Sequence, residues 1–207
     1  MVERQLAARG IRDPRVLAAF RSVPRELFVP EGLRASAYQD NPLPIGEGQT
    51  ISQPYIVALM AQLLELRDQD RVLEVGTGCG FAAAIFSCLA REVYSIERRP
   101  DLAEAARVRL RNLGFDRVRV SVGDGSLGIS ELAPFDAIVV AASGPEIPAA
   151  LKAQLAVGGR LVMPMGATHR SQRLTRVQRA SEHEFDVEDL GAVTFVPLIG
   201  RQAWADS

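Results

Sequence analysis

Residues 71–81 read Arg71-Val72-Leu73-Glu74-Val75-Gly76-Thr77-Gly78-Cys79-Gly80-Phe81, and this stretch decides the fold. Its first half is a short apolar run that predicts a buried strand. Glycines at alternate positions follow at once, and glycine lets the backbone adopt positive φ and approach a ligand closely. An alanine-rich helix is expected directly afterwards, from Phe81 to Leu89. Free N–H groups at the start of a helix favour an anionic group. The stretch therefore predicts a strand, a ligand-binding loop and a helix.

Short apolar runs alternate with helical patterns through most of the remaining chain. Strands are predicted at 93–97, 118–122, 137–140 and 160–163, helices at 100–113 and 148–155, and a hairpin around 172–195. Strands that alternate with helices at short intervals indicate βαβ units and a parallel sheet. We therefore expect an α/β, Rossmann-like, doubly wound fold.

The first 66 residues follow a different pattern. Two short helices are predicted within 1–30, and a helix begins at Gln53-Pro54 and continues to residue 66. Between them, residues 35–52 show no periodicity and contain several prolines and glycines. A long irregular segment in a compact domain is usually functional or mobile. We predict a single domain over 1–207, with 1–66 as an N-terminal part and 67–207 as the core.

Composition excludes several classes of protein. The chain has 207 residues, 47% hydrophobic and 24% charged, with a net charge of −1, which is typical of one globular domain without a basic surface for nucleic acid or membrane. Its two cysteines lack the spacing of a disulfide framework or a zinc site, so no metal is expected. No signal peptide is recognisable, and no apolar run reaches the roughly 20 residues that span a bilayer. A cytoplasmic location is expected.

Two further acids end predicted strands. Glu97 follows the glycine loop at the ~20-residue distance where an acid binds ribose hydroxyls in dinucleotide folds. Asp124 lies between two glycines after the third strand. Because the carboxyl ends of parallel strands share one edge of the sheet, an adenine contact is expected for Asp124. The G-x-G-x-G spacing differs from the G-x-G-x-x-G of dinucleotide enzymes, which disfavours a dehydrogenase.

Residues 72–80 resemble the first motif of class I S-adenosylmethionine-dependent methyltransferases. Other stretches resemble the protein-L-isoaspartate O-methyltransferase family in particular, in order along nearly the whole chain. These stretches are Gln49-Thr50-Ile51-Ser52-Gln53-Pro54-Tyr55, Gly123-Asp124-Gly125, Pro134-Phe135-Asp136-Ala137-Ile138, Pro145-Glu146-Ile147-Pro148, Gly158-Gly159-Arg160-Leu161-Val162 and Phe195-Val196-Pro197-Leu198.

The resemblance implies a mixed seven-stranded sheet with an N-terminal helical extension. It also implies transfer of a methyl group from S-adenosylmethionine to the carboxylate of L-isoaspartyl residues in damaged proteins, which initiates their repair. Within the cofactor site, it assigns the ribose to Glu97 and the adenine end to Asp124 and Gly125. The methionine part is assigned to the first motif, at Glu74, Gly76, Thr77, Gly78 and Gly80.

The resemblance places Ser52 beside the methyl group and the substrate, as the catalytic residue. The alternative interpretation of Ser52 is an N-cap of the following helix, and both roles are compatible. The segment 42–55 would cover the cofactor. The substrate would contact Thr50, Ile51, Ser52, Ala141, Ala142 and Val196.

The expected chemistry needs few catalytic groups. A carboxylate is ionised at neutral pH and requires no general base before it attacks a methyl group on sulfur. The protein must align the two groups and exclude water. His169 and His183 lie in a charged late region and are predicted to be surface residues.

Several positions depart from the residues usual in the family. Cys79, Phe81, Ala82 and Ser126 differ, and so does the stretch 141–144, where substrate backbone is expected to bind. Other interpretations therefore remain: a carboxyl methyltransferase with a different small-molecule or protein substrate, a cofactor-binding sensor or scaffold, and a dehydrogenase. A monomer without nucleic-acid or membrane partners is expected.

Overall fold

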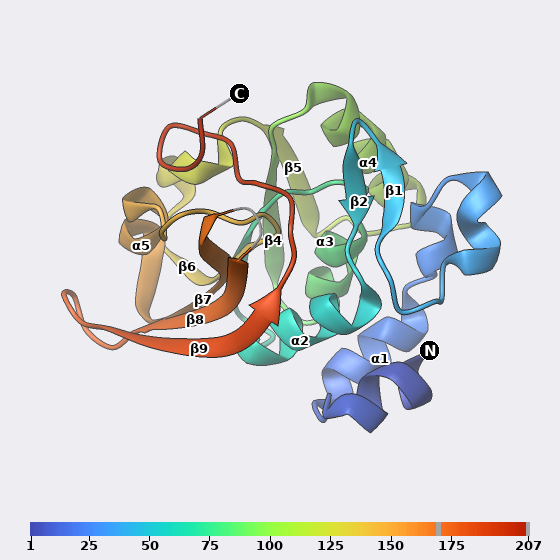
Figure 1. Cartoon of the computed structure of the whole chain (residues 1–207), viewed down its shortest axis with the longest axis horizontal. Coiled ribbons are helices and arrows are strands. Elements are labelled where there is room, and N and C mark those ends of the chain that lie inside the picture. Colours follow the sequence, from blue (N-terminus) through green and yellow to red (C-terminus); the bar gives the residue numbers. More distant parts are fainter. Residues whose placement is uncertain (169–170, 206–207) are drawn as a thin grey trace.

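The structure, a computed structural model, describes residues 1–168 and 171–205 (Figure 1). Its helices are α1 (Pro14–Ser22), α2 (Pro54–Leu64), α3 (Phe81–Ser87), α4 (Pro100–Asn112) and α5 (Ala149–Gln154). The strands are β1 (Leu43–Gly46), β2 (Gln49–Ile51), β3 (Arg71–Val75), β4 (Glu92–Glu97), β5 (Val118–Val122), β6 (Phe135–Val140), β7 (Leu155–Thr168), β8 (Ser171–Arg179) and β9 (Phe185–Val193). Shorter helical turns lie at Val2–Leu6, Ala7–Arg9, Arg25–Phe28, Glu31–Ser36, Gly125–Leu127 and Ser130–Leu132.

Seven strands form one mixed sheet in the order β5-β4-β3-β6-β7-β8-β9. Strands β3 to β7 are parallel, whereas β8 and β9 are antiparallel. The predicted Rossmann-like sheet and the predicted late hairpin are both confirmed. Strand β7 is longer than predicted at both ends, because Leu155 already pairs with Phe135 of β6 and the antiparallel pairing with β8 continues to Thr168.

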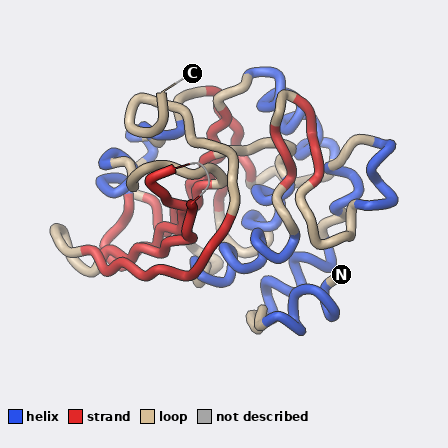
Figure 2. Tube along the Cα trace, viewed as in Figure 1, coloured by secondary structure: helices blue, strands red, loops and turns tan. Residues whose placement is uncertain are grey.

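Alternate residues of the central strands supply two separate cores. Val72 and Val93 face one core together with side chains from α1, α2, α3 and α4. Leu73 and Val75 face the other core, which α5 completes through Leu151. Successive side chains of a strand point to opposite faces, so strands that are buried on both faces read as nearly continuous apolar runs. Figure 2 shows these helices around the strands.

The N-terminal part differs from expectation. Where 35–52 was expected to be irregular, β1 and β2 form an antiparallel hairpin that is separate from the main sheet. Its turn, Gly46-Glu47-Gly48, has positive φ at all three residues. These strands have four and three residues and pair only with each other, which is too short for a recognisable alternation. Within the described residues, no helix has both the length and the apolar character needed to cross a membrane.

Candidate active site

A cavity of about 320 Å³ lies at the carboxyl ends of the central strands. The chain passes from β3 through β4 to β5 on one side of β3, and then returns to β6 on the other side. In open α/β sheets, ligands bind in the crevice at such a switch point. Four segments surround the cavity: the β1–β2 hairpin with the start of α2, the glycine loop, the turn after β4, and the coil after β9. The lining residues are 48–52, 57, 75–79, 81–82, 96–99, 125, 141–142 and 196–199.

The glycine loop has the backbone geometry that its sequence predicted. Gly76 and Gly78 line the cavity with φ of 96° and 52°. Gly80 does not line the cavity, and it precedes α3 with φ of 90°. A Cβ on Gly80 would lie 3.1 Å from the Leu110 side chain of α4, so this glycine allows close packing of two helices.

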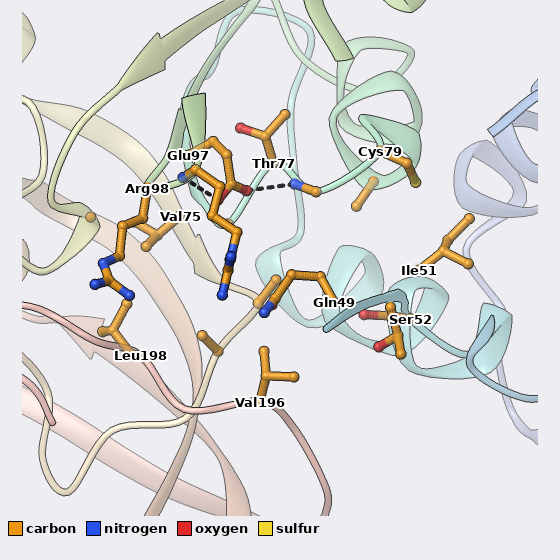
Figure 3. Close-up of a pocket in the computed structure, with 18 of the residues that line it drawn as sticks. Gln49, Ile51, Ser52, Val75, Thr77, Cys79, Glu97, Arg98, Val196 and Leu198 are labelled. Atoms are coloured by element: carbon orange, nitrogen blue, oxygen red, sulfur yellow. Dashed lines mark hydrogen bonds between the residues drawn. The ribbon is translucent and has the colours of Figure 1, made fainter. Parts of the chain in front are cut away.

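Glu97 joins the end of β4 to the glycine loop. Its Oε2 accepts a hydrogen bond from the Gly78 N–H at 2.8 Å, and its Oε1 accepts one from the Arg99 N–H at 3.0 Å (Figure 3). The side chain lines the cavity, although only 7% of the residue is exposed. Each carboxylate oxygen has two lone pairs, so both oxygens can accept further hydrogen bonds from a ligand.

Glu74 lies behind the loop rather than in the cavity. Its residue is fully buried, and its Oε2 accepts a hydrogen bond from Ser95 Oγ. Ser95 Oγ lies 2.5 Å from Thr77 Oγ1, and Thr77 lines the cavity. Burial raises the pKa of Glu74 to about 8, and the nearby Glu97 adds to this effect, whereas the Ser95 hydrogen bond opposes it. Glu74 does not itself line the cavity, but hydrogen bonds connect it through Ser95 to Thr77, and its assignment to the methionine part stays a prediction.

The carboxylate of Asp124 is also hydrogen-bonded within the chain. Its Oδ1 accepts hydrogen bonds from Ser126 N and Ser126 Oγ at 2.9 and 2.6 Å, and its Oδ2 accepts one from Arg201 N at 2.8 Å. Burial raises the pKa of Asp124, but the Ser126 and Arg201 hydrogen bonds outweigh burial and leave it lowered. Asp124 is not among the lining residues, whereas Gly125 is. The chain itself supplies partners for this carboxylate, and the adenine contact expected for Asp124 and Gly125 stays a prediction.

Ser52 lies on a different side of the cavity from Glu97, with Gln49 between them (Figure 3). Its alternative role as a helix cap is not what the structure shows. The N-cap position of α2 is Gln53, which forms no side-chain cap hydrogen bond.

Asp40 takes over that capping role. Its Oδ1 accepts a hydrogen bond from Tyr55 N at 3.0 Å, and its Oδ2 accepts one from Gln53 Nε2 at 2.8 Å. Within the described parts of the chain, Ser52 Oγ has no hydrogen-bond partner, so the hydroxyl is available to a ligand.

The other predicted substrate residues come together at the same cavity, which Thr50, Ile51, Ala141, Ala142 and Val196 all line. The sequence did not predict that Arg98 and Arg99 line the cavity. They could have been found, because they directly follow Glu97 at the end of a strand. Prediction from sequence assigned no individual role to Leu198 or Ile199, although it placed the neighbouring Val196 at the substrate.

The remaining polar residues show no metal-binding arrangement. Cys79 and Cys88 are both free. His183 is exposed, as expected, and His169 lies outside the described residues. Over residues 1–168 and 171–205, no group of three or more histidine, cysteine, aspartate or glutamate side chains could hold a metal ion.

The family model described as protein-L-isoaspartate(D-aspartate) O-methyltransferase matches residues 1–203. The chain belongs to this family. A protein-L-isoaspartate O-methyltransferase of Protochlamydia amoebophila (strain UWE25) is 57% identical over 204 residues, which cover 99% of this chain and 97% of the relative. Protein-L-isoaspartate O-methyltransferase 2 of Pelobacter propionicus is 56% identical, with 99% and 91% of the two chains covered.

Solved structures of the family share the fold. One protein-L-isoaspartate O-methyltransferase superposes with a TM-score of 0.88 at 28% identity, covering 98% of this chain and 67% of the other. A Plasmodium falciparum protein-L-isoaspartate O-methyltransferase, in complex with S-adenosyl-L-homocysteine, gives a TM-score of 0.82 at 26% identity, with 97% of each chain covered. The resemblance found in the sequence is thereby confirmed.

Proposed function

We propose that this protein transfers a methyl group from S-adenosylmethionine to the carboxylate of L-isoaspartyl residues in damaged proteins, the first step of their repair. The observation that carries the proposal is the family match over residues 1–203. The structure adds a cavity at the switch point of the sheet, lined by the glycine loop, Glu97 and Ser52.

The residues of the cavity fit this cofactor. Gly76 and Gly78 allow backbone N–H groups to approach the methionine part, because no side chain intervenes at positive φ. Glu97 offers two acceptor oxygens to the two adjacent ribose hydroxyls. Gly125 and Leu198 also line the cavity, and we assign the adenine end of the cofactor to them. A volume of about 320 Å³ is near the lower end of the usual range for small-molecule sites.

The chain's own residues have to orient the substrate and exclude water. When bound, the cofactor supplies a methyl group on a sulfonium. A substrate carboxylate is already ionised at neutral pH and needs no proton removed. We assign to Ser52, which lines the cavity, a hydrogen bond to one carboxylate oxygen that leaves the other oxygen free to attack. Apolar side chains such as Ile51 and Val196 keep the site dry, which favours a step that neutralises opposite charges.

One assay tests the proposal. The protein is incubated with labelled S-adenosylmethionine and two peptides that differ only in an L-isoaspartyl or an L-aspartyl linkage. We expect label in the isoaspartyl peptide alone. If the cofactor binds but neither peptide is labelled, the alternative of another carboxylate substrate gains support, consistent with the unusual residues at 141–144.

The remaining expectations about partners belong to the same proposal. A net charge of −1 gives no electrostatic basis for nucleic-acid binding. We infer a monomer that acts in the cytoplasm.

A further inference from the structure

The coil after β9 forms one wall of the cavity without belonging to the sheet. Val196, Pro197, Leu198 and Ile199 all line the cavity, and Figure 3 labels Val196 and Leu198 on this coil. A coil lacks the ladder of hydrogen bonds that fixes a strand, so side-chain and isolated backbone contacts must set its position. The contacts that hold this coil therefore shape the cavity.

One set of contacts lies just beyond the lining residues. Asp124 Oδ2 accepts a hydrogen bond from Arg201 N at 2.8 Å, and Ser126 Oγ accepts one from Gln202 N at 3.0 Å. Ser126 also donates its own hydroxyl hydrogen to Asp124 Oδ1 at 2.6 Å. Two side chains at the end of β5 thus bind two consecutive backbone N–H groups of the C-terminal segment.

Gly200 lies against the same two side chains. A Cβ on this residue would be 2.1 Å from Asp124 Oδ1 and 2.5 Å from Ser126 Oγ. Real Cβ atoms essentially never approach other atoms so closely, so any other residue would displace the coil or the two side chains. Glycine here serves close approach, because its φ is not positive.

The coil has a second attachment on the β6 side. Ser143 N donates to Val196 O at 2.8 Å, and Ser143 O accepts hydrogen bonds from Leu198 N at 2.8 Å and Trp204 Nε1 at 3.0 Å. The backbone of Ser143 thus holds the coil on the β6 side, while the side chains of Asp124 and Ser126 hold the segment that follows it.

We propose that Asp124, Ser126 and Gly200 form a clasp that holds the coil 196–199 against the cavity and thereby sets the affinity for the cofactor. Ser126 and Gly200 act as positioning residues through Leu198 and Ile199, whereas Asp124 also keeps the adenine contact expected from sequence. The inference rests on the proposed function, because it takes this cavity to be the S-adenosylmethionine site.

The decisive variant is Gly200→Ala. Gly200 lines no part of the cavity, so its substitution removes no ligand contact. An Asp124 substitution would not separate the clasp from the adenine contact expected from sequence. Gly32→Ala is the matched control, because a Cβ there meets nothing within 4 Å and the backbone is not left-handed. Ser126→Ala is a second variant, which removes hydrogen bonds without adding atoms.

The measurements are the dissociation constant of S-adenosylhomocysteine by calorimetry, the steady-state constants, and hydrogen exchange of the amides of 196–204. For Gly200→Ala we expect affinity to fall about tenfold or more and the KM for S-adenosylmethionine to rise similarly. The kcat and the KM for peptide should change little. Ser126→Ala should show the same pattern, more weakly, and Gly32→Ala should match the wild type. Faster exchange over 196–204 should accompany weaker binding.

The proposal is overturned if both clasp variants bind S-adenosylhomocysteine within twofold of the wild type, whether or not the coil exchanges faster. It is also overturned if kcat falls while cofactor affinity is unchanged. If Gly200→Ala fails to fold, Ser126→Ala decides by the same criteria. Wild-type protein that binds no S-adenosylhomocysteine would instead refute the proposed function, so the two failures are distinguishable.

Discussion

Ser52 and Glu97 both present oxygen atoms to the cavity, but their protein contacts differ. Glu97 is already braced by the N–H groups of Gly78 and Arg99, which fix its carboxylate before any ligand arrives. Ser52 Oγ has no partner over the described residues and is held only by the turn that precedes α2. Substitution of Ser52 and substitution of Glu97 should therefore change turnover and cofactor affinity differently.

Ser52→Ala should slow turnover and leave cofactor binding nearly unchanged. A hydrogen bond to a charged group contributes about 1.5–3 kcal/mol, so kcat/KM for the isoaspartyl peptide should fall roughly 10- to 150-fold. Binding of S-adenosylhomocysteine, measured by calorimetry, should stay within about twofold of the wild type. Equal losses of turnover and of cofactor affinity would show that Ser52 serves the cofactor site or the fold instead.

Glu97→Ala should show the reverse pattern. Loss of both carboxylate oxygens removes hydrogen bonds to a charged group, which contribute about 1.5–3 kcal/mol. Binding of S-adenosylhomocysteine should therefore weaken roughly 10- to 100-fold. The kcat at saturating cofactor should fall much less than the affinity does. Unchanged affinity would remove the ribose assignment.

Glu74 should make stability depend on pH. Its pKa is raised to about 8 in the folded protein, whereas an unfolded glutamate titrates near 4.3. Between these values the unfolded chain has lost this proton and the folded chain retains it. The free energy of unfolding therefore falls as pH rises through this window, by at most about 1.4 kcal/mol per pH unit from this group.

The matched variant is Glu74→Gln, which keeps the shape and cannot titrate. Urea unfolding of both proteins from pH 5.5 to 8 should give a shallower decline for Glu74→Gln, so the variant gains stability relative to the wild type as pH rises. Parallel curves for the two proteins would mean that Glu74 is ionised in the folded state.

Among the helices, α1 and α2 pack beside each other and have the same kind of N-terminal cap. Helices α1 and α2 both start with a proline, and an aspartate accepts hydrogen bonds from their first N–H groups. Asp13 caps α1 from the adjacent position, through Arg15 N and Val16 N. Asp40 caps α2 from 15 residues earlier in the chain, through Tyr55 N. Only the second cap adjoins Ser52.

Asp40→Ala and Asp13→Ala should therefore both lose stability, but only Asp40→Ala should also lose activity. Loss of a helix cap costs about 0.5–2 kcal/mol, and urea unfolding should show such a loss for both. Only Asp40→Ala should also reduce kcat, several-fold, because the turn that carries Ser52 loses its anchor. An equal fall in kcat for Asp13→Ala would make the effect one of general stability.

At the scale of the whole molecule, the cavity connects parts that are far apart in sequence. The β1–β2 hairpin, the glycine loop and the C-terminal coil all line it, and Figure 1 shows the hairpin and the coil arriving from different sides. Arg99 Nη1 also contacts Glu47 Oε2 of the hairpin turn at 3.0 Å. A ligand in the cavity should therefore stabilise both ends of the chain together.

S-adenosylhomocysteine at 100 times its dissociation constant should raise the free energy of unfolding by about 2.7 kcal/mol. For a chain of this length, that corresponds to a rise in Tm of roughly 5–10 °C. Hydrogen exchange should slow in both 43–51 and 196–199 when the ligand binds. Slower exchange confined to the glycine loop would contradict a cavity closed by the hairpin and the coil.

The sequence alone determined the features that depend on neighbouring residues. The run from Val72 to Gly80 specified a strand, a loop with positive φ and a helix, since glycine and apolar periodicity act locally. Glu97 was identified for the same reason, because its distance from the loop follows from one βαβ unit.

Only the tertiary structure decided where side chains find partners from elsewhere. Glu74 and Asp124 were both assigned to the cofactor, and the structure adds partners that the sequence did not predict, namely Ser95 for Glu74 and the backbone at Arg201 for Asp124. Nothing near Asp124 indicates that Gly200 packs against it, because that contact joins residues 76 positions apart. Contacts of this kind depend on how the sheet and the final coil pack together, so the sequence around each residue does not predict them.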